Sequence, residues 1–135
     1  MRATQITPYV MASPGRDYLF VKVETDEGIY GWGEGTLEMK CQTVAAAVRE
    51  LAQFVLGEDP TRVDYLWQRM YRQTMAFGRK GITMVAISAL DIALWDLMGK
   101  ASGQPGTGRP RNGTARHRPE PTTTASARPS VGAGT

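Results

Sequence analysis

The composition of the chain changes abruptly near Gly103, and this break limits what the sequence can fold into. From Gln104 to Thr135 the 32 residues include no aromatic side chain, and Val131 is the only large aliphatic one. Such a segment cannot bury enough apolar surface to offset the entropy lost on ordering it. We therefore expect one folded domain over residues 1–104 and a disordered tail, rich in Arg, Pro, Gly and Thr, over residues 105–135.

The net charge of +3 divides at the same place. From residue 104 onward there are five Arg and one Glu, a balance of +4, so residues 1–103 carry −1, from 11 basic and 12 acidic side chains. The high isoelectric point therefore belongs to the tail. It gives no reason to expect that the folded part binds nucleic acid.

Three β-strand patterns open the chain. The segment Tyr18–Thr25 alternates apolar and polar residues, as a half-buried strand does. A weaker β-prone segment covers Ala3–Met11, and Ile29–Glu34 follows a turn signal at Gly28 that favours a hairpin. We expect Ser13–Asp17 to be a loop between the first two strands. The pattern predicts a three-stranded antiparallel sheet arranged as a meander.

Three helical patterns follow the strands. Apolar residues recur at helical spacing over Thr43–Leu56 and again as far as Met75, after Asp59-Pro60, which is a typical helix start. The third pattern, Ile82–Ala101, is apolar on nearly every side and therefore needs partners on both faces. The fold class we expect is α+β, with the antiparallel sheet followed by a three-helix part.

No membrane segment is expected. The most apolar stretch, Ile82–Met98, has 17 residues and contains two Asp, so we judge it too short and too charged to span a bilayer. The N-terminus lacks the basic-then-apolar pattern of a signal peptide. These two observations predict a cytoplasmic protein.

Closely spaced glycines occur in Gly31-Trp32-Gly33-Glu34-Gly35, after a strand and before a helix. Dinucleotide-binding loops have such glycines, but their fingerprint needs a third glycine where Thr36 stands, and it follows a strand of a parallel unit. We interpret the glycines as the exit of the chain from the sheet into a loop. Trp32 then belongs to the core or to the wall of a pocket.

The residues for general-base or nucleophilic chemistry are missing from the domain. The only histidine, His117, lies in the predicted tail, where nothing orients it. The only cysteine, Cys41, excludes a disulfide framework and a zinc spacing, and we expect it to be a core or helix-flanking thiol. We therefore predict no catalytic residue on this chain.

Two groups of charged residues remain as candidates. Glu34 and Glu38 follow the third strand, but two loosely spaced acids are too few for a metal site, so we predict no metal ligand. Arg79 and Lys80 precede the third helix, whose N-terminus favours negative charge. They form either an anion-binding loop or a solvated basic turn.

Several segments, taken in order, resemble a known family. They are YLFVKVETDEGIYGWGEG, TVAAAVREL, DPTRVDYLWQRMYR and, above all, ISALDIALWDLMGKASGQP. They look like the N-terminal capping domain of the mandelate racemase/muconate lactonizing group of the enolase superfamily. The stretch FGRKGITMVAISALDIALWDLMGK is most similar to sugar-acid dehydratases of the rhamnonate, galactonate and mannonate type. The resemblance covers residues 1–105.

The resemblance implies a function that needs a second domain. In that family an α+β cap packs against a barrel of roughly 250 residues. The barrel carries a lysine or histidine base and three acids that hold Mg²⁺, which stabilises the enediolate formed when a proton next to a carboxylate is removed. Two cap loops close over the substrate, and here they correspond to Ser13–Asp17 and Glu34–Thr43. The residues that the resemblance makes candidate substrate contacts are Arg16, Asp17, Trp32 as a wall, Glu34 and Lys40.

The match stops after GKASGQP. The family continues into the first barrel strand, whereas this chain continues with GTGRPRNGTARHRPEPTTTASARP, which looks like a gene read out of frame or a truncated product. We expect the chain to be inactive alone, to bind no cofactor itself, and to meet Mg²⁺ and a sugar acid only in a full-length context. Its expected partner is a missing or separately encoded barrel. The alternative is an interaction module that forms homo-oligomers through an exposed apolar face of the third helix.

Overall fold

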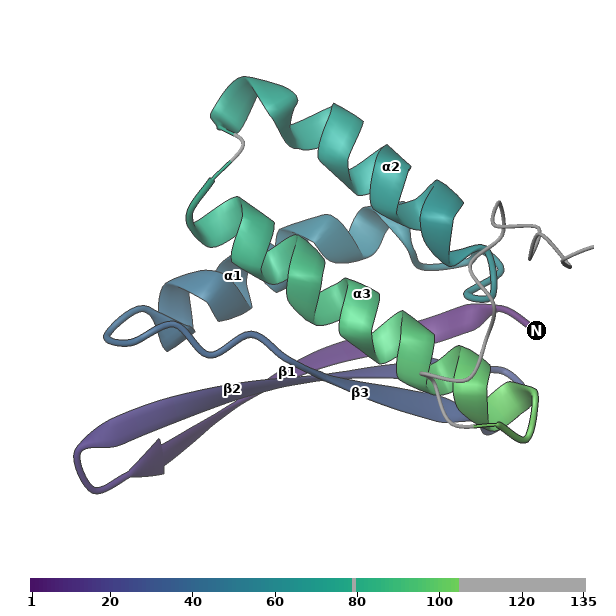
Figure 1. The fold of residues 1–135 in the computed structure, drawn as a ribbon, viewed down its shortest axis with the longest axis horizontal. Coiled ribbons are helices and arrows are strands. Elements are labelled where there is room, and N and C mark those ends of the chain that lie inside the picture. Colours follow the sequence, from purple (N-terminus) through teal and green to yellow (C-terminus); the bar gives the residue numbers. More distant parts are fainter. Residues whose placement is uncertain (79, 105–135) are drawn as a thin grey trace, which may run out of the picture.

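The computed structural model describes residues 1–78 and 80–104, so the predicted disorder of residues 105–135 and the predicted role of Arg79 lie outside the described residues. Three strands come first: β1 (Ala3–Ser13), β2 (Arg16–Thr25) and β3 (Tyr30–Glu34). They form one antiparallel sheet in the order β1-β2-β3. The predicted meander is therefore confirmed (Figure 1).

Three α-helices follow the sheet. Helix α1 spans Cys41–Leu51 and continues into a short 3-10 turn, η1 (Ala52–Phe54). Helix α2 spans Val63–Thr74, with a second 3-10 turn, η2 (Met75–Phe77), at its end. Helix α3, Ile82–Ala101, has the bounds expected from the sequence. The α+β prediction is confirmed for the part of the chain that the structure describes.

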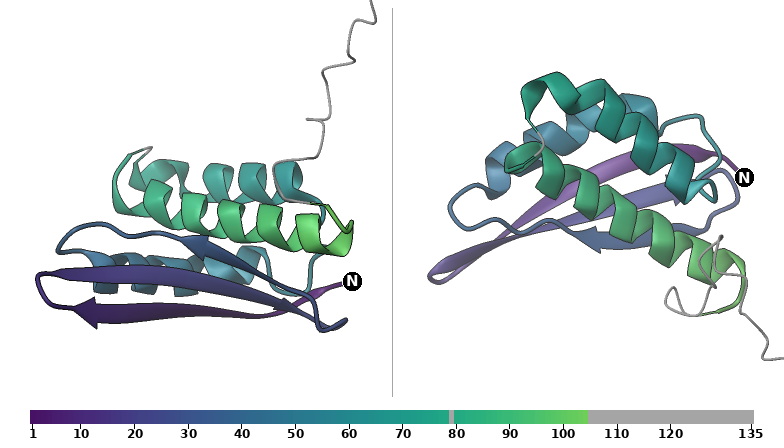
Figure 2. Two further views of the ribbon diagram at one scale, coloured as in Figure 1. Left: turned by 60° about the horizontal axis from the view of Figure 1, so that its bottom comes forward. Right: turned by 45° about the horizontal axis from the view of Figure 1, so that its top comes forward.

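The helices cover one face of the sheet. Along β2 the alternating residues Leu19, Val21 and Val23 are fully buried, while Phe20 and Lys22 between them are only partly buried. This alternation places the helices on one side, as the two views in Figure 2 show. Helix α1 lies over β1 and β2, α3 lies over β2 and β3, and α2 packs on α3.

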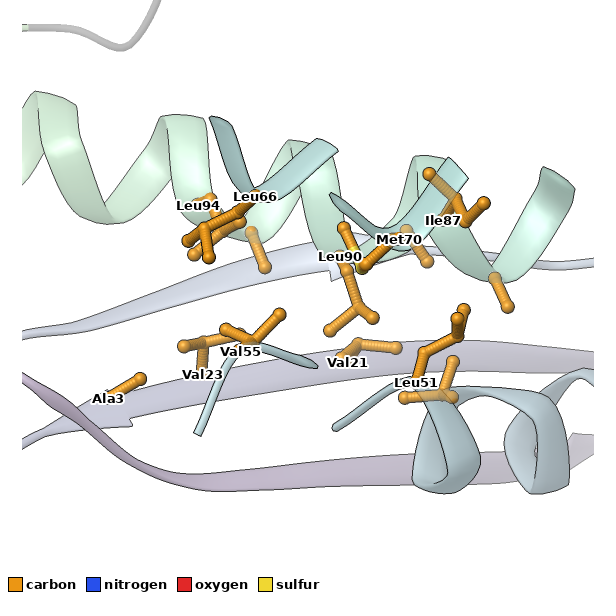
Figure 3. Packing of buried hydrophobic residues seen from close by; sticks show 14 of the residues in the cluster. Ala3, Val21, Val23, Leu51, Val55, Leu66, Met70, Ile87, Leu90 and Leu94 are labelled. Carbon is orange, nitrogen blue, oxygen red and sulfur yellow. The ribbon is translucent and has the colours of Figure 1, made fainter. Parts of the chain in front are cut away.

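The core is one apolar cluster between the sheet and the helices. Figure 3 shows its centre, where side chains from β2 meet those from α2 and α3. Burying such side chains contributes about 1.5–3 kcal/mol each. The largest fully buried ones are Leu19, Leu66, Met70, Ile87, Leu90, Leu94, Leu97, Val21, Val23, Val44, Val48 and Val55.

The expected loop Ser13–Asp17 is much shorter in the structure. Ser13 pairs with Arg16, and Ala12 pairs with Asp17, so both strands extend to the hairpin end. Only Pro14 and Gly15 form the turn, and Gly15 has a φ of 84°, which suits a residue without a side chain. The alternating pattern that identifies strands is weak here, which is why this extension was missed.

The start of α2 also differs from the expectation. The helix begins at Val63, not at Pro60, because Asp59 forms a local turn. Its carboxylate accepts hydrogen bonds from the amide of Thr61 at 3.0 Å and from the Thr61 hydroxyl at 2.8 Å. Asp side chains favour such turns as readily as helix starts. Both hydrogen bonds lower the pKa of Asp59.

The glycines of the motif at residues 31–35 serve close packing. Gly31 and Gly33 lie within β3 and face α3, where an added Cβ would lie 2.0 Å from a carbonyl oxygen of the helix in each case. The expectation that these glycines release the chain from the sheet was therefore wrong. They let β3 approach the helix backbone.

Helix α3 is half core and half surface. It has 20 residues, more than the 17 considered from the sequence, and by length and composition alone it is apolar enough to cross a membrane. Half of the apolar stretch of this helix is buried inside the fold, as in the core helix of a soluble protein. On its outer side Ile92 is 49% exposed and Trp95 is half-buried. The expected apolar outer face is thus interrupted by Ser88 and Asp91.

Candidate functional site

Three connections lie at one end of the molecule. They are the β1–β2 turn, the segment 35–40 after β3, and the link between η2 and α3 (Figures 1 and 2). The sequence places most of its candidate residues in or beside these connections. Arg16, Asp17, Glu34, Lys40 and Lys80 each lie in one of these connections or directly beside it in the chain.

The segment after β3 is fixed to the start of β2. The amide of Gly35 donates to the carbonyl of Leu19 at 3.0 Å, and the amide of Leu19 donates to the hydroxyl oxygen of Thr36 at 3.1 Å. The buried Cys41 thiol donates to the carbonyl of Asp17 at 3.5 Å, which joins the start of α1 to the hairpin end. The two segments that the resemblance identifies as cap loops are therefore neighbours.

The charged groups of Arg16, Lys40 and Lys80 lie in different surroundings. The Arg16 guanidinium lies 5.2 Å from the centre of the Tyr18 ring, a cation–π contact on the outer face of the sheet. Lys40 is exposed and occupies the N-cap of α1, where its carbonyl accepts a hydrogen bond from the amide of Val44 at 2.9 Å. Lys80 is exposed and directly precedes Gly81, the N-cap of α3.

The N-termini of two helices, α1 and α3, directly follow two of these connections. Neither α1 nor α3 has an acidic residue in its first turn or a side-chain cap at its N-cap. Uncapped amides and the helix dipole both favour a negative group nearby. From the sequence, only the N-terminus of the third helix is considered as an anion site, because Arg79 and Lys80 precede it.

The acidic candidates have partners within the same region. Glu34 accepts a hydrogen bond from the hydroxyl of Thr36 at 2.8 Å, so Thr36 links Glu34 to Leu19 of β2. Asp17 is exposed and contributes its carbonyl to Cys41. Sequence reasoning noticed Thr36 only as a break in a glycine pattern. Its linking role depends on the strand pairing and has no signal in the sequence.

The ring of Trp32 lies on the face of the sheet opposite the helices. It is 39% exposed on the outer face of the sheet, and its ring lies 5.5 Å from the ring of Tyr9 and 5.9 Å from the ammonium of Lys22. It shares this face of β3 with Glu34, two residues further on. Of the five candidate substrate contacts, Trp32 is the one that does not adjoin the connections at the end of the molecule.

The donor set in the described residues does not fit a magnesium site. They contain no group of three or more His, Cys, Asp or Glu side chains that could hold a metal ion. Mg²⁺ in proteins is bound through carboxylates and other oxygen ligands in octahedral geometry. No step of a metal-assisted reaction can therefore be assigned to this part of the chain.

A groove of about 360 Å³ opens elsewhere, between α1, α2 and the start of α3. None of the six candidate residues that the structure describes lines it. The groove is lined by Ala47, Glu50, Leu51, Gln53, Phe54, Gln73, Thr74, Phe77 and Thr83.

Comparison with known proteins places this fold in a family. Residues 2–107 match the family described as "Mandelate racemase / muconate lactonizing enzyme, N-terminal domain". Over 106 residues the chain is 53% identical to the D-galactonate dehydratase of Xanthomonas campestris pv. campestris (strain B100). That match covers 78% of this chain and 26% of the relative.

Solved structures show the same domain within longer chains. The 3,6-anhydro-D-galactonate cycloisomerase from Zobellia galactanivorans superimposes with a TM-score of 0.72 at 36% identity, covering 76% of this chain and 29% of that one. An enolase from Pantoea ananatis with bound D-gluconate and Mg superimposes with a TM-score of 0.66 at 36% identity, covering 75% of this chain and 25% of that one. The chain thus spans about a quarter of the length of the proteins it matches.

Proposed function

The chain belongs to the mandelate racemase / muconate lactonizing enzyme family, in which it corresponds to the N-terminal domain, and we propose that it is the substrate-specificity cap of a Mg²⁺-dependent sugar-acid dehydratase. On its own it has no dehydratase activity. The observation that carries the proposal is the 53% identity with a D-galactonate dehydratase over 106 residues, which are only 26% of that enzyme.

The cap's contribution to such an enzyme is recognition. A sugar acid has a carboxylate and several hydroxyl groups. Arg16 and Lys40 supply cationic donors beside the cap connections, and Asp17 and Glu34 supply acceptors for hydroxyl groups. In this proposal Trp32 forms an apolar wall of the substrate site. Lys80, near the N-terminus of α3, adds a further cationic group in one of these connections.

The partner we propose is a barrel domain, either missing from this chain or separately encoded. The outer side of α3 supports this, because Ile92 is 49% exposed there and Trp95, which packs on the core in part, is only half-buried. Burial raises the pKa of the neighbouring Asp91 carboxyl, and the negative charge of Asp64 raises this pKa further. The second candidate is self-association through this same side of α3. In either case we place the protein in the cytoplasm.

A chimera tests the recognition role directly. The matching 106 residues of the Xanthomonas campestris D-galactonate dehydratase are replaced by residues 2–107 of this chain. The chimera, assayed with Mg²⁺ against a panel of sugar acids, should dehydrate at least one of them. In that chimera Arg16→Ala and Lys40→Ala should each lower kcat/KM by about tenfold or more, the loss of one charge-assisted hydrogen bond. Arg49→Ala, on α1, serves as the matched control.

The chain by itself provides the complementary test. Purified full-length chain with Mg²⁺ and the same panel should show no turnover, and measurable dehydration would overturn the claim that it is inactive alone. A folded chimera that is inactive on every sugar acid would overturn the claim that this cap serves a dehydratase. Sedimentation of the chain alone separates the barrel partner from self-association, because only the second predicts a concentration-dependent dimer.

A further inference from the structure

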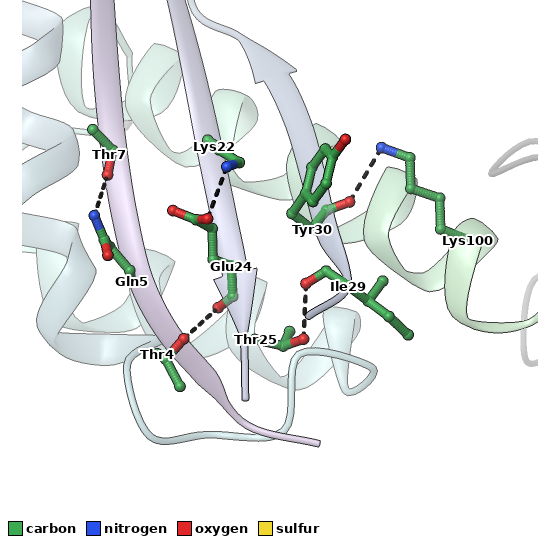
Figure 4. Close-up of polar contacts among 9 residues, drawn as sticks. All are labelled: Thr4, Gln5, Thr7, Lys22, Glu24, Thr25, Ile29, Tyr30 and Lys100. Carbon is green, nitrogen blue, oxygen red and sulfur yellow. Dashed lines mark hydrogen bonds and ion pairs between the residues drawn. The ribbon is translucent and has the colours of Figure 1, made fainter. Parts of the chain in front are cut away.

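The open edge of β3 is covered by two side chains of α3. In an antiparallel pair, alternate residues turn their backbone groups toward the neighbouring strand, and the residues between them turn theirs away. The amide of Trp32 points away from β2 and donates to Asp96 Oδ2 at 2.9 Å. The carbonyl of Tyr30 also points away and accepts a hydrogen bond from Lys100 Nζ at 3.1 Å (Figure 4).

The two side chains also bind each other. Lys100 Nζ donates to Asp96 Oδ2 at 2.7 Å, one helical turn apart on α3. A neighbouring strand would offer a carbonyl oxygen to the Trp32 amide and an N–H group to the Tyr30 carbonyl. The Asp96 carboxylate serves as that acceptor for the Trp32 amide, and the Lys100 ammonium group serves as that donor to the Tyr30 carbonyl. The pair therefore occupies the positions of backbone groups that a fourth strand would use.

An ordinary surface ion pair is the alternative interpretation. The pair Lys22–Glu24 is such a case: its nitrogen–oxygen distance is also 2.7 Å, but it lies on the face of the sheet and joins two side chains of one strand (Figure 4). Exposed pairs of this kind contribute little to stability. Asp96 and Lys100 differ because they bind backbone groups 64 and 70 residues away in the sequence.

Strand edges with free backbone groups recruit other chains, and proteins use charged side chains or covering elements to prevent it. Without Asp96 and Lys100, β3 would expose an amide and a carbonyl beside the rings of Tyr30 and Trp32, which are 44% and 39% exposed. Every copy of the chain has the same edge. Two such edges can pair in antiparallel orientation about a twofold axis, which makes a second copy the natural occupant.

We propose that Asp96 and Lys100 form a strand surrogate, which closes the edge of β3 to pairing with a second copy of this chain. This assigns an interaction role to the segment LWDLMGK, in which the two residues stand four apart. The proposal is independent of the dehydratase function, since it concerns only the described residues and their own edge.

The test compares four forms of the full chain. They are the wild type, Lys100→Met, the double variant Asp96→Ala/Lys100→Ala, and Glu58→Ala/Arg69→Ala as the control, which removes an ion pair that does not touch β3. Sedimentation velocity at several concentrations gives the dimer dissociation constant, and hydrogen exchange measured by NMR gives the protection of the Trp32 amide. We expect the double variant to dimerise at least ten times more tightly than the wild type. In its monomer the Trp32 amide should exchange faster, and dimerisation should protect it again.

The control variant should behave as the wild type in both measurements. The double variant overturns the proposal if it sediments as the wild type at every concentration, or if its dimer leaves the Trp32 amide unprotected. If the double variant does not fold, as circular dichroism would reveal, Lys100→Met decides. It keeps most of the apolar stem, frees the Tyr30 carbonyl and removes the ion pair with Asp96, while Asp96 still accepts from the Trp32 amide. A folded Lys100→Met variant that self-associates no more than the wild type also overturns the proposal.

Discussion

Gly33 of β3 lies so close to Ala89 of α3 that an added Cβ would be 2.0 Å from the Ala89 carbonyl oxygen and 2.9 Å from the amide nitrogen of Ala93. Gly31 stands in the same relation to Ala93 and Leu97, one helical turn further along α3. Strand β3 therefore packs directly against the backbone of α3. Four properties of the chain follow from this contact and its neighbours.

Gly33→Ala should lower the free energy of unfolding by about 3 kcal/mol or more, because the helix backbone must move to admit the methyl group. Urea unfolding measures the loss. Gly28→Ala is the control, since its Cβ meets nothing within 4 Å and the positive φ of 76° alone should account for about 1–2 kcal/mol. Equal losses in the two variants would mean that close packing is not the reason for Gly33.

Thr36→Val should lower the free energy of unfolding by about 1–3 kcal/mol, because the amide of Leu19 loses its acceptor. The amide of Leu19 should also exchange faster with solvent, and the segment after β3 should lose protection. Thr36→Ser keeps the hydroxyl and should stay within about 0.5 kcal/mol of the wild type. A Val variant as stable as the Ser variant would contradict this role.

Lowering the pH should weaken the contact between Asp96 and the edge of β3. Burial pushes the pKa of Asp96 up, but the hydrogen bonds from Lys100 and from the Trp32 amide outweigh it, so the folded-state pKa lies below the ordinary value. Asp96 therefore contributes stability above its unfolded pKa, and this contribution is lost as the pH falls through the folded pKa. The unfolding free energy of the wild type should fall more steeply below about pH 4 than that of Asp96→Asn. Parallel curves from acid titration would contradict this.

Asp91 should behave in the opposite way. Burial and then the charge of Asp64 raise its pKa, and a hydrogen bond from Trp95 opposes them only in part. Because the folded-state pKa is raised, ionised Asp91 destabilises the fold, and stability falls as the pH rises through that pKa. Asp91→Asn should increase the melting temperature at pH 7 but not at about pH 3, where both carboxyl and amide are neutral. An equal increase at both values would contradict the electrostatic explanation.

Local patterns were sufficient to predict most of the fold. The bounds of α3 were predicted correctly because the apolar pattern lies between two glycines, Gly81 and Gly103, both with positive φ. The inward residues of β2 followed from strict alternation. The start of α2 was misplaced because Asp59 has two local alternatives, a helix N-cap and a turn, and sequence spacing does not separate them.

The candidate site was harder to predict, because its links join residues far apart in the sequence. Asp91 and Asp96 are five residues apart, a spacing that places them on different sides of a helix. This spacing gave no indication that Asp96 binds the amide of Trp32, 64 residues away. The glycines at 31–35 were recognised as unusual, but their reason is a helix that comes more than 50 residues later. Which face of the sheet carries Trp32 also depended on the register of β2 and β3.

The seating of β3 on α3 also determines where this cap can change shape. Gly31, Gly33 and Gly35 hold the strand against the helix, so these two elements move as one body. In the segment that follows, Thr36 binds Leu19 and Leu37 packs on the core, and the most exposed point is Met39, which has a φ of 61° and is 93% exposed. Any change of shape in this segment is thus restricted to a few residues, because its two ends are fixed at Gly35 and Cys41. Under the proposed function, so short a segment changes its reach only slightly, which favours selection among ligands of similar size.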